Sequence, residues 1–520
     1  MLRVTTFIVL ATVLILLLVN LLHKDDPINK SQYELRQKYI FKPSAKVDHS
    51  KFTALQRDFE TPQEVTETCI SCHNERHIEV MHSNHWNWDR VEYVEGKGIA
   101  KLGKKNVLNN FCIGASGNEQ ACAKCHIGFG MDGNTFDFTN ARNVDCMVCH
   151  DQSEAYFKGA ALAGYPDRNV NLTEVAQHVG RPNKINCGAC HFYSGGGNNV
   201  KHGDLEESLL SCSRTTDVHM ASNGINMDCV DCHTAEKHQI KGRLYSVSST
   251  NTNRLECTEC HTTKPHLNDL LNRHYSKVSC QTCHIPTYAK ENATKMNWLW
   301  SEAGKLDENG QPYHEEDTMG NHSYLSIKGS FKWEKNVQPE YYWFNGKAKH
   351  YALGDTVSTF PIQVNALLGD ADDPHAKIYP VKVHRGNQIY DPNTKMLIQP
   401  RLYAESKGDS AFWEDFDWAL AAEAGMKDVG LPYSGEYKFV DTEMYWPVNH
   451  MVAPKNEALS CNECHVSQNG RLASLEGLYL PGRDRNYWID LFGHLLLIGS
   501  FAGVGIHTFA RIVASKSKNN

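Results

Sequence analysis

The sequence lacks any excess of basic residues, since 53 lysines and arginines stand against 60 aspartates and glutamates, for a net charge of -7. Nucleic-acid binding needs a basic surface, so this balance argues against a nucleic-acid partner. No Gly-Lys-Ser/Thr follows the glycine run at 195–197, which excludes a phosphate-binding loop there. Strand-like alternation is also scarce, so the predicted fold class is mainly α with little regular sheet.

Cysteine is absent from residues 285–460 but recurs regularly elsewhere, in eight copies of Cys-x-x-Cys-His. The cysteines are Cys69, Cys72, Cys122, Cys125, Cys146, Cys149, Cys187, Cys190, Cys229, Cys232, Cys257, Cys260, Cys280, Cys283, Cys461 and Cys464. The histidines are His73, His126, His150, His191, His233, His261, His284 and His465. The pattern is the attachment signature of c-type haem, in which two thiols form thioethers and the histidine ligates iron. Zinc knuckles and redox dithiols are the alternatives, but neither explains a histidine after every pair. We therefore predict eight covalently bound haem c groups.

The spacing of these motifs decides what forms the core. Seven motifs fall within residues 69–284, which leaves too little chain around each one for a conventional core. We expect the haem stack itself to be the core, inside a multihaem cytochrome c domain at residues 24–485. Residues 285–460 are rich in tryptophan and tyrosine and are expected to form a haem-free wrap around the stack. Within it, residues 411–424 read as one helix, capped by Asp409 or Ser410 and closed by Gly425.

Both ends of the chain carry apolar stretches. Residues 4–22 are uncharged and long enough to span a bilayer, so residues 1–23 are predicted to be an N-terminal signal anchor, with a cleaved signal peptide as the alternative. A second span is predicted at 488–513, and the basic residues after it place that end in the cytoplasm. Covalent haem attachment takes place outside the bacterial cytoplasmic membrane. The bulk of the chain is therefore expected on the periplasmic side of that membrane.

The C-terminal span carries two histidines, His494 and His507, about 20 Å apart along a helix. Intramembrane ionisable residues are functional candidates, and a haem b shared with a membrane partner would suit this depth. The alternative is that both histidines lie at the interfaces or pack against another helix. Gly499 and Gly503 form a small-x-x-x-small pair, which favours packing against a partner such as a quinol-oxidising cytochrome b.

Several longer segments resemble one known family, the octahaem tetrathionate reductases among c-type cytochromes. The resemblance runs from about Lys46 to Arg485, and its segments are 104–113, 186–193, 200–204, 217–220, 280–286 and 445–455. That family is related in haem arrangement to hydroxylamine oxidoreductases and pentahaem nitrite reductases. The resemblance implies two-electron reduction of tetrathionate or a related sulfur oxyanion, or of nitrite or hydroxylamine.

The resemblance also implies roles for individual residues. Lys201 would replace a distal histidine on the haem of the second motif, the active site, and Cys112 would be the free cysteine beside it. The remaining distal ligands would be His85, His202, His219, His238, His266, His274 and His450. From the residues alone, Cys112 has an alternative, a disulfide with Cys212.

Three functions remain open at this stage. The first is a terminal reductase of a small inorganic oxyanion. The second is a membrane-anchored electron-transfer subunit that passes electrons from a quinol-oxidising cytochrome b to another protein. The third is a hydroxylamine oxidase, which in its relatives needs a tyrosine cross-linked to the catalytic haem, and no tyrosine here can be given that role.

Overall fold

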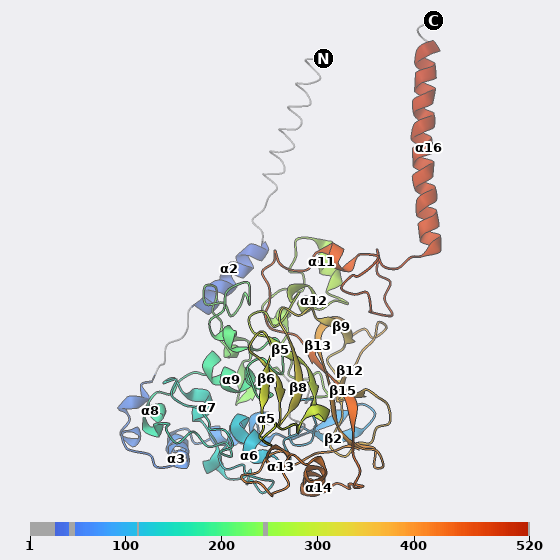
Figure 1. Ribbon diagram of the computed structural model, residues 1–520. Helices are drawn as coiled ribbons and strands as arrows, with labels where there is room; N and C mark the ends of the chain where they lie inside the picture. The colour runs from blue at the N-terminus through green and yellow to red at the C-terminus, as the bar shows by residue number, and fades with distance from the viewer. Residues whose placement is uncertain (1–26, 41–46, 112–113, 243–247, 518–520) are drawn as a thin grey trace. The chain divides into compact units, whose positions relative to one another are not determined.

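A computed structural model describes residues 27–40, 47–111, 114–242 and 248–517 (Figure 1). The chain forms two compact units, Met1–Ala458 and Leu459–Asn520. Seven attachment motifs belong to the first unit and the eighth belongs to the second. The predicted membrane segment at 1–23 lies outside the described residues, as does Cys112. The predicted domains at 24–485 and 488–513 stay predictions.

Residues 49–284 form short helices and turns. The α-helices are α3 (Pro62–Cys72), α4 (Arg76–Met81), α5 (Asn84–Asn87), α6 (Glu119–Cys122), α7 (Met147–His150), α8 (Leu172–Gln177), α9 (Lys184–His191), α10 (Cys229–Cys232), α11 (Asp269–His274) and α12 (Cys280–His284), preceded by α2 (Pro27–Ile40). The 3-10 turns include η1 (His49–Lys51), η2 (Thr53–Leu55), η3 (Ala123–Cys125), η4 (Ala141–Asn143), η5 (Glu207–Leu210) and η7 (Cys257–Glu259). Two hairpins interrupt them, β1 (Arg90–Val94) with β2 (Gly98–Leu102) and β3 (Ala235–Glu236) with β4 (Gln239–Ile240).

Residues 294–447 build a nine-stranded sheet in which the strands run β11-β15-β13-β5-β8-β7-β6, and β9 and β14 also pair with β13 (Figure 1). The strands are β5 (Thr294–Leu299), β6 (His314–Glu316), β7 (His322–Leu325), β8 (Gly329–Glu334), β9 (Glu340–Phe344), β11 (Ile362–Gln363), β13 (Lys377–Asp391), β14 (Met396–Leu397) and β15 (Lys438–Pro447). A separate pair joins β10 (Ala348–His350) to β12 (Asn365–Leu367). The long strand β13 lies between β15 and β5, antiparallel to the first and parallel to the second.

The expectation of little regular sheet was therefore wrong for this segment. Alternation is missing because β13 is buried along most of its length, on both faces, as strands in the middle of a covered sheet are. Polar residues take part in that burial, since Lys382 and His384 have no exposed surface. A reading based on alternating polarity could not recognise such a strand.

The sheet carries the largest hydrophobic cluster of the described chain. Trp298 stacks on Trp300 with ring centroids 4.9 Å apart, and Phe412 stacks on Trp418 at 3.8 Å. Trp298, Trp300 and Phe412 are at most 1% exposed. The segment without attachment motifs thus supplies most of a hydrophobic core, to which Leu108, Phe111 and Val200 also contribute, rather than only covering a haem stack.

The predicted helix at 411–424 is two helices, α13 (Phe412–Asp415) and α14 (Trp418–Asp428). Phe416 breaks it by taking a left-handed conformation with φ of 53°. Asp417, rather than Asp409 or Ser410, caps the longer helix by accepting from the backbone of Ala419 and Leu420. Gly425 lies within α14 and does not end the helix. Glycine is needed there because a Cβ would collide with the Gln399 carbonyl oxygen.

The second unit contains α15 (Cys461–Cys464) and α16 (Tyr487–Ser517). Residues Tyr487–Ala514 are 28 residues long with a mean hydropathy of 1.7, and no part of this stretch is buried. By length and composition this helix can cross a membrane, which agrees with the span predicted at 488–513.

Candidate haem-binding and redox site

Each attachment motif folds into a single helical turn. The backbone amide of the motif histidine donates to the carbonyl of the first cysteine in several of them, at 2.8 Å for His73, 2.7 Å for His233 and 2.8 Å for His261. Both thiols and the imidazole therefore project from one tight turn. That arrangement lets one macrocycle bond to both sulfurs while the histidine reaches its iron from the same side.

Six of the eight motif histidines face a second imidazole, with ring centroids 6.0 to 6.5 Å apart. The pairs are His73 with His49, His191 with His85, His150 with His238, His261 with His219, His233 with His450, and His284 with His266. An iron held between two imidazoles by bonds of about 2.0 Å would separate the ring centroids by about 6.3 Å. The chain thus presents six places whose dimensions fit a haem iron with two histidine ligands.

The orientation of these rings also suits ligation. Nδ1 of His150 donates to the Gly180 carbonyl at 2.8 Å, and Nδ1 of His233 donates to the Lys241 carbonyl at 2.8 Å. In the histidines that face these two, Nδ1 of His238 is hydrogen-bonded to the Glu79 carboxylate and Nδ1 of His450 to the Asp204 carboxylate. A proton fixed on Nδ1 leaves Nε2 as the ligating nitrogen.

Burial favours the neutral, metal-binding form of three of these imidazoles. Desolvation lowers the pKa of His191 to about 3, and it lowers the pKa values of His85 and His150 as well. His450 differs, because its hydrogen bond to Asp204 raises its pKa although burial alone would lower it.

Cysteines of different motifs lie against one another. Hydrogen-bonding contacts join Cys69 with Cys146, Cys125 with Cys190, Cys187 with Cys229, and Cys257 with Cys280. Electrostatic interactions join Cys149 with Cys190 and Cys232 with Cys260. Together these contacts connect the seven motifs of the first unit in a row in the order first, third, fourth, fifth, sixth and seventh, and the second motif joins this row as a branch at the fourth. Electron transfer between neighbouring cofactors requires such a continuous connection.

The second motif has a different environment. Aromatic rings surround its His126, with Trp88, Phe136 and Trp86 at centroid distances of 5.0, 5.2 and 5.4 Å. Burial lowers the pKa of His126 to about 3, and the buried Lys158 donates to its carbonyl oxygen. Within the described part of the chain, no imidazole pairs with His126 as in the other six motifs. The second motif therefore differs from those six in the side chains that surround its histidine.

Lys201 lies close to the fourth motif, which is in contact with the second. His202 is the next residue along the chain. Lys201 interacts electrostatically with His191 of the fourth motif, whose Cys190 contacts Cys125 of the second. The Lys201 ammonium lies 4.9 Å from the centre of the Trp446 ring, and the buried His202 meets the same ring edge-on at 4.9 Å. His202, predicted as a distal ligand, thus packs against an indole on β15 in this structure.

Strand β13 brings two predicted catalytic segments together. Lys382 donates to the carbonyls of Val200 and Lys201 at 3.1 and 3.0 Å, and to Thr294 Oγ1 at 2.6 Å. Two residues further along, His384 packs on the Phe111 ring at 4.1 Å, and its carbonyl accepts from Asn110 at 3.1 Å. Phe111 is the residue before Cys112. The loop carrying Lys201 and the segment leading to Cys112 therefore converge on one buried strand.

His384 itself has unusual surroundings. Neither ring nitrogen has a hydrogen-bond partner among the described residues, and the side chain has no exposed surface. Burial together with the nearby Lys382 and Lys295 holds its pKa well below the usual value, so the ring is neutral. A buried imidazole with two open nitrogens beside lysines can offer a hydrogen bond to an anion.

Known proteins with similar sequences and structures agree with this geometry. A family model described as Cytochrome c bacterial matches residues 295–468. An uncharacterized protein of Archaeoglobus fulgidus is 25% identical over 243 residues, which are 37% of this chain and 80% of that protein. The crystal structure of octaheme cytochrome c from Shewanella oneidensis is 42% identical with a TM-score of 0.76, and the match covers 83% of this chain and 96% of that chain. This chain belongs to the octahaem cytochrome c family. Covalently bound haem c and a role in haem-based electron transfer or redox catalysis follow from that membership.

Sequence reasoning missed one residue of this octahaem cytochrome. His49 lies opposite His73, on the 3-10 turn η1 capped by Asp48. It precedes every attachment motif and lies outside the segments of family resemblance, so only its pairing in space reveals it. The remaining predicted ligand, His274, bonds through Nδ1 to the Leu270 carbonyl at 2.8 Å on α11, an arrangement that also leaves Nε2 for a metal.

The remaining predicted site residues are Cys212 and residues of α16. Cys212 is buried in a small cluster with Phe192, Leu209 and Ala221, and the predicted alternative of a disulfide with Cys112 stays a prediction. On α16, Nδ1 of His494 donates to the Asp490 carbonyl at 2.6 Å. Among the described residues, no neighbouring segment lies within 4 Å of a Cβ placed at Gly499 or Gly503.

Proposed function

We propose that this octahaem cytochrome is a reductase of a sulfur oxyanion such as tetrathionate, with its active site at the second motif. The observation that carries the proposal is the convergence of the Lys201 loop and the segment before Cys112 on β13. Lys201 connects this strand, through His191 and Cys190 of the fourth motif, to the second motif, whose His126 is in none of the six imidazole pairs. Lys295 and Lys201 lie in this region, and positively charged amines there would favour a dianionic substrate.

For the iron ligands, we assign the six facing histidines to the six motif histidines that they oppose. Five of them, His85, His219, His238, His266 and His450, are also implied by the family resemblance, and His49 replaces His202 in that set. His274 is left for the eighth motif, and Lys201 for the second. Lysine is a more labile ligand than histidine, so the second iron would be the one that can open toward a substrate.

The chemistry is a two-electron cleavage. Haem c supplies one-electron steps at iron, and the row of motifs delivers two electrons in succession. The central S–S bond of tetrathionate breaks, each half leaves as thiosulfate, and no net proton is consumed.

The residues of the chain would orient the substrate for this step. The Lys201 ammonium, once released, would face the developing negative charge, and the neutral His384 would offer a hydrogen bond. Cys112 would exchange with a sulfane sulfur as a thiolate and be regenerated by the incoming electrons.

We further propose that the protein is anchored in the bacterial cytoplasmic membrane with its haem domain in the periplasm. The apolar helix α16 supports an anchor. A quinol-oxidising cytochrome b would then be the electron source, in contact with the Gly499 and Gly503 face, and a haem b bound by His494 or His507 belongs to the same proposal.

The test is turnover by the holoprotein with a chemical reductant. Wild type should produce two thiosulfates per tetrathionate, and its absorption and electron paramagnetic resonance spectra should change at one iron of eight on substrate addition. Lys201→Leu should alter that one spectrum and lower turnover at least tenfold. The matched control Lys407→Leu, at an exposed lysine far along the chain, should leave both unchanged.

A second function is favoured by α16, whose entire surface is open to a membrane or a partner. In that case the protein would be an electron-transfer subunit between a cytochrome b and another protein. Eight irons with unchanged spectra, no thiosulfate production, and rapid electron transfer to a second protein would favour this function over the reductase.

A further inference from the structure

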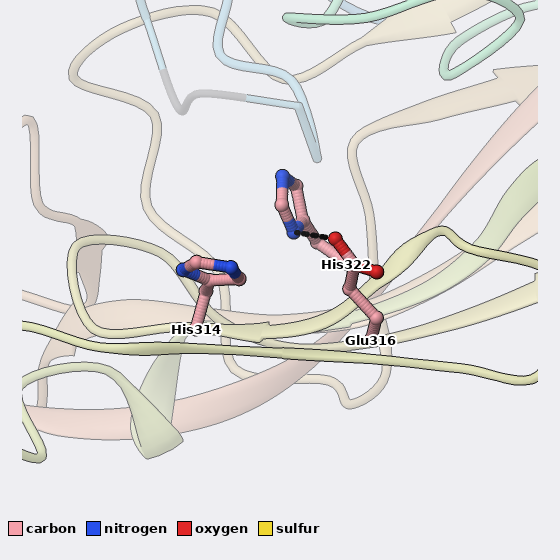
Figure 2. Close-up of side chains that lie close together, drawn as sticks. All are labelled: His314, Glu316 and His322. Carbon is pink, nitrogen blue, oxygen red and sulfur yellow. Dashed lines mark ion pairs between the residues drawn. The ribbon is translucent and has the colours of Figure 1, made fainter.

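The hairpin formed by β6 and β7 carries a cluster of metal-ligating side chains far in sequence from any attachment motif. His314, Glu316 and His322 place one ligand atom each within 4.8 Å of one another (Figure 2). The two imidazole rings meet edge-on at 5.2 Å, and Nδ1 of His322 lies 4.0 Å from Glu316 Oε1. All three side chains are exposed, so their rotation can close the remaining distance.

A β-bulge brings the three residues to one face. In the hairpin Glu315 pairs with Tyr324, but Glu316 pairs with His322, so Ser323 is an extra residue. Without that extra residue, His322 would point to the face opposite His314 and Glu316, because side chains alternate along a strand. The bulge therefore turns a histidine toward a histidine and a carboxylate.

The hairpin holds this arrangement in place. In the connecting turn, the Asp317 carboxylate accepts from the backbone amides of Met319 and Asn321 at 2.8 and 2.9 Å. The carbonyl of His322 accepts from the Trp333 indole at 2.7 Å, which fixes the backbone of this ligand to β8. A backbone that is already ordered reduces the entropy cost of gathering three ligands around an ion.

The local charge also favours a cation. Residues 307–317 include five acidic side chains and no lysine or arginine. Two imidazoles and one carboxylate are the donor set that suits zinc and neighbouring transition metals, whereas magnesium and calcium prefer oxygen ligands alone.

We propose that His314, Glu316 and His322 form a surface site for a divalent transition-metal ion, with zinc as the reference ion. Three protein ligands leave a further coordination position for water or for a donor atom of another molecule. This inference is independent of the proposed reductase activity, since no attachment motif contributes to the hairpin.

The experiment uses the full-length holoprotein, dialysed to equilibrium against micromolar zinc chloride, with zinc and iron counted together by mass spectrometry. His314→Ala and His322→Ala should each retain one zinc per chain fewer than wild type, and their affinity should fall at least about tenfold. Glu316→Gln should give a smaller loss. Excess magnesium should displace none of the zinc.

The matched control is His375→Ala, which removes an exposed histidine from a different loop and should retain the zinc content of wild type. The haem absorption spectrum should be the same in every variant, which separates this result from any failure of the proposed function. Equal zinc content in wild type, His314→Ala and His322→Ala would overturn the proposal, as would displacement of the zinc by magnesium.

Discussion

Residues 69–284 and residues 285–458 belong to one compact unit but are held together in different ways. In the first segment the buried apolar side chains form small separate clusters, such as that of Phe192, Leu209 and Ala221. In the second, besides two smaller clusters, one large cluster of aromatic and aliphatic side chains covers a nine-stranded sheet and also takes in Leu108, Phe111 and Val200 of the first segment. The comparison teaches that one chain can fold half of itself around cofactors and half around its own side chains.

The two segments also contribute different parts to the proposed function. The cofactor-dependent segment supplies the row of motifs, and the sheet supplies the rigid strand β13 on which the Lys201 loop and the segment before Cys112 converge. Under the proposed reductase function, a strand in a packed sheet would position a substrate site better than loops between cofactors.

The largest expected effect comes from removing one cofactor. The double change Cys146→Ala and Cys149→Ala should lower the covalently bound haems from eight to seven by intact mass. It should also greatly increase amide hydrogen exchange in residues 69–284, because little apolar surface remains to hold them. Residues 285–458 should keep most of their protection. Cys212→Ala is the control, since this cysteine lies outside the motifs. An equal loss of amide protection in residues 69–284 and 285–458 of the double variant would contradict the comparison.

The second largest effect is expected from a cavity created in the core beside the sheet. Phe412 is fully buried and stacked on Trp418, so Phe412→Ala should destabilise the protein by about 3–5 kcal/mol. The unfolding midpoint, followed by circular dichroism, should fall while the haem spectrum of the native protein stays unchanged. Tyr437→Ala, at a side chain that is 39% exposed, should have little effect. A haem spectrum altered by Phe412→Ala would show that the two cores are not separate.

A smaller effect is expected at Asp391, at the end of β13. Burial alone would raise its pKa, but hydrogen bonds from Ser434, Thr394 and Asn393 hold it below the usual value. Because the pKa is lowered by folding, the stabilisation is present above the unfolded value of about 3.9 and is lost as the pH falls through the folded value.

Asp391→Asn should therefore cost about 1–3 kcal/mol at pH 7, as expected for a buried group with lost hydrogen bonds. The difference in free energy of unfolding between Asp391→Asn and wild type should become smaller below about pH 4. Denaturant unfolding at several pH values measures this difference. Asp372→Asn, at an exposed carboxylate, is the control, and a difference that grows on acidification would contradict the assignment.

The smallest effect on either segment is expected from truncation before Leu491, which removes most of α16. Turnover with a chemical reductant should stay intact, because no motif lies beyond His465. Reduction by quinol in reconstituted membranes should be lost. Unchanged quinol-dependent rates would rule out a role for this helix in electron entry.

The attachment motifs could be predicted from the sequence because each one is complete within five residues. Distal partners could be predicted only where a family resemblance existed. His49 shows the limit, since nothing in its own neighbourhood distinguishes it from a surface histidine until it is seen opposite His73.

The sheet could not be predicted, because its longest strand is buried on both faces and contains polar residues. Lys382 looks like a surface residue in the sequence, yet it is fully buried and three oxygen acceptors surround its Nζ atom. Likewise, the bulge at Ser323 that gathers His314, Glu316 and His322 depends on strand pairing, which residue spacing alone does not reveal.

The histidine pairs have a further consequence for how the chain folds. Under the proposed ligation, the six irons close loops of very different lengths, from 18 residues between His266 and His284 to 106 between His85 and His191 and 217 between His233 and His450. Closing a loop of about 100 residues in the unfolded state removes entropy worth about 4.7 kcal/mol when the link is a disulfide. Six such crossings would act as reversible cross-links, so a chain that has received its haems but not its second ligands would be compact only in part. Reduction or ligand exchange at iron would then loosen tertiary structure as well as change a redox state.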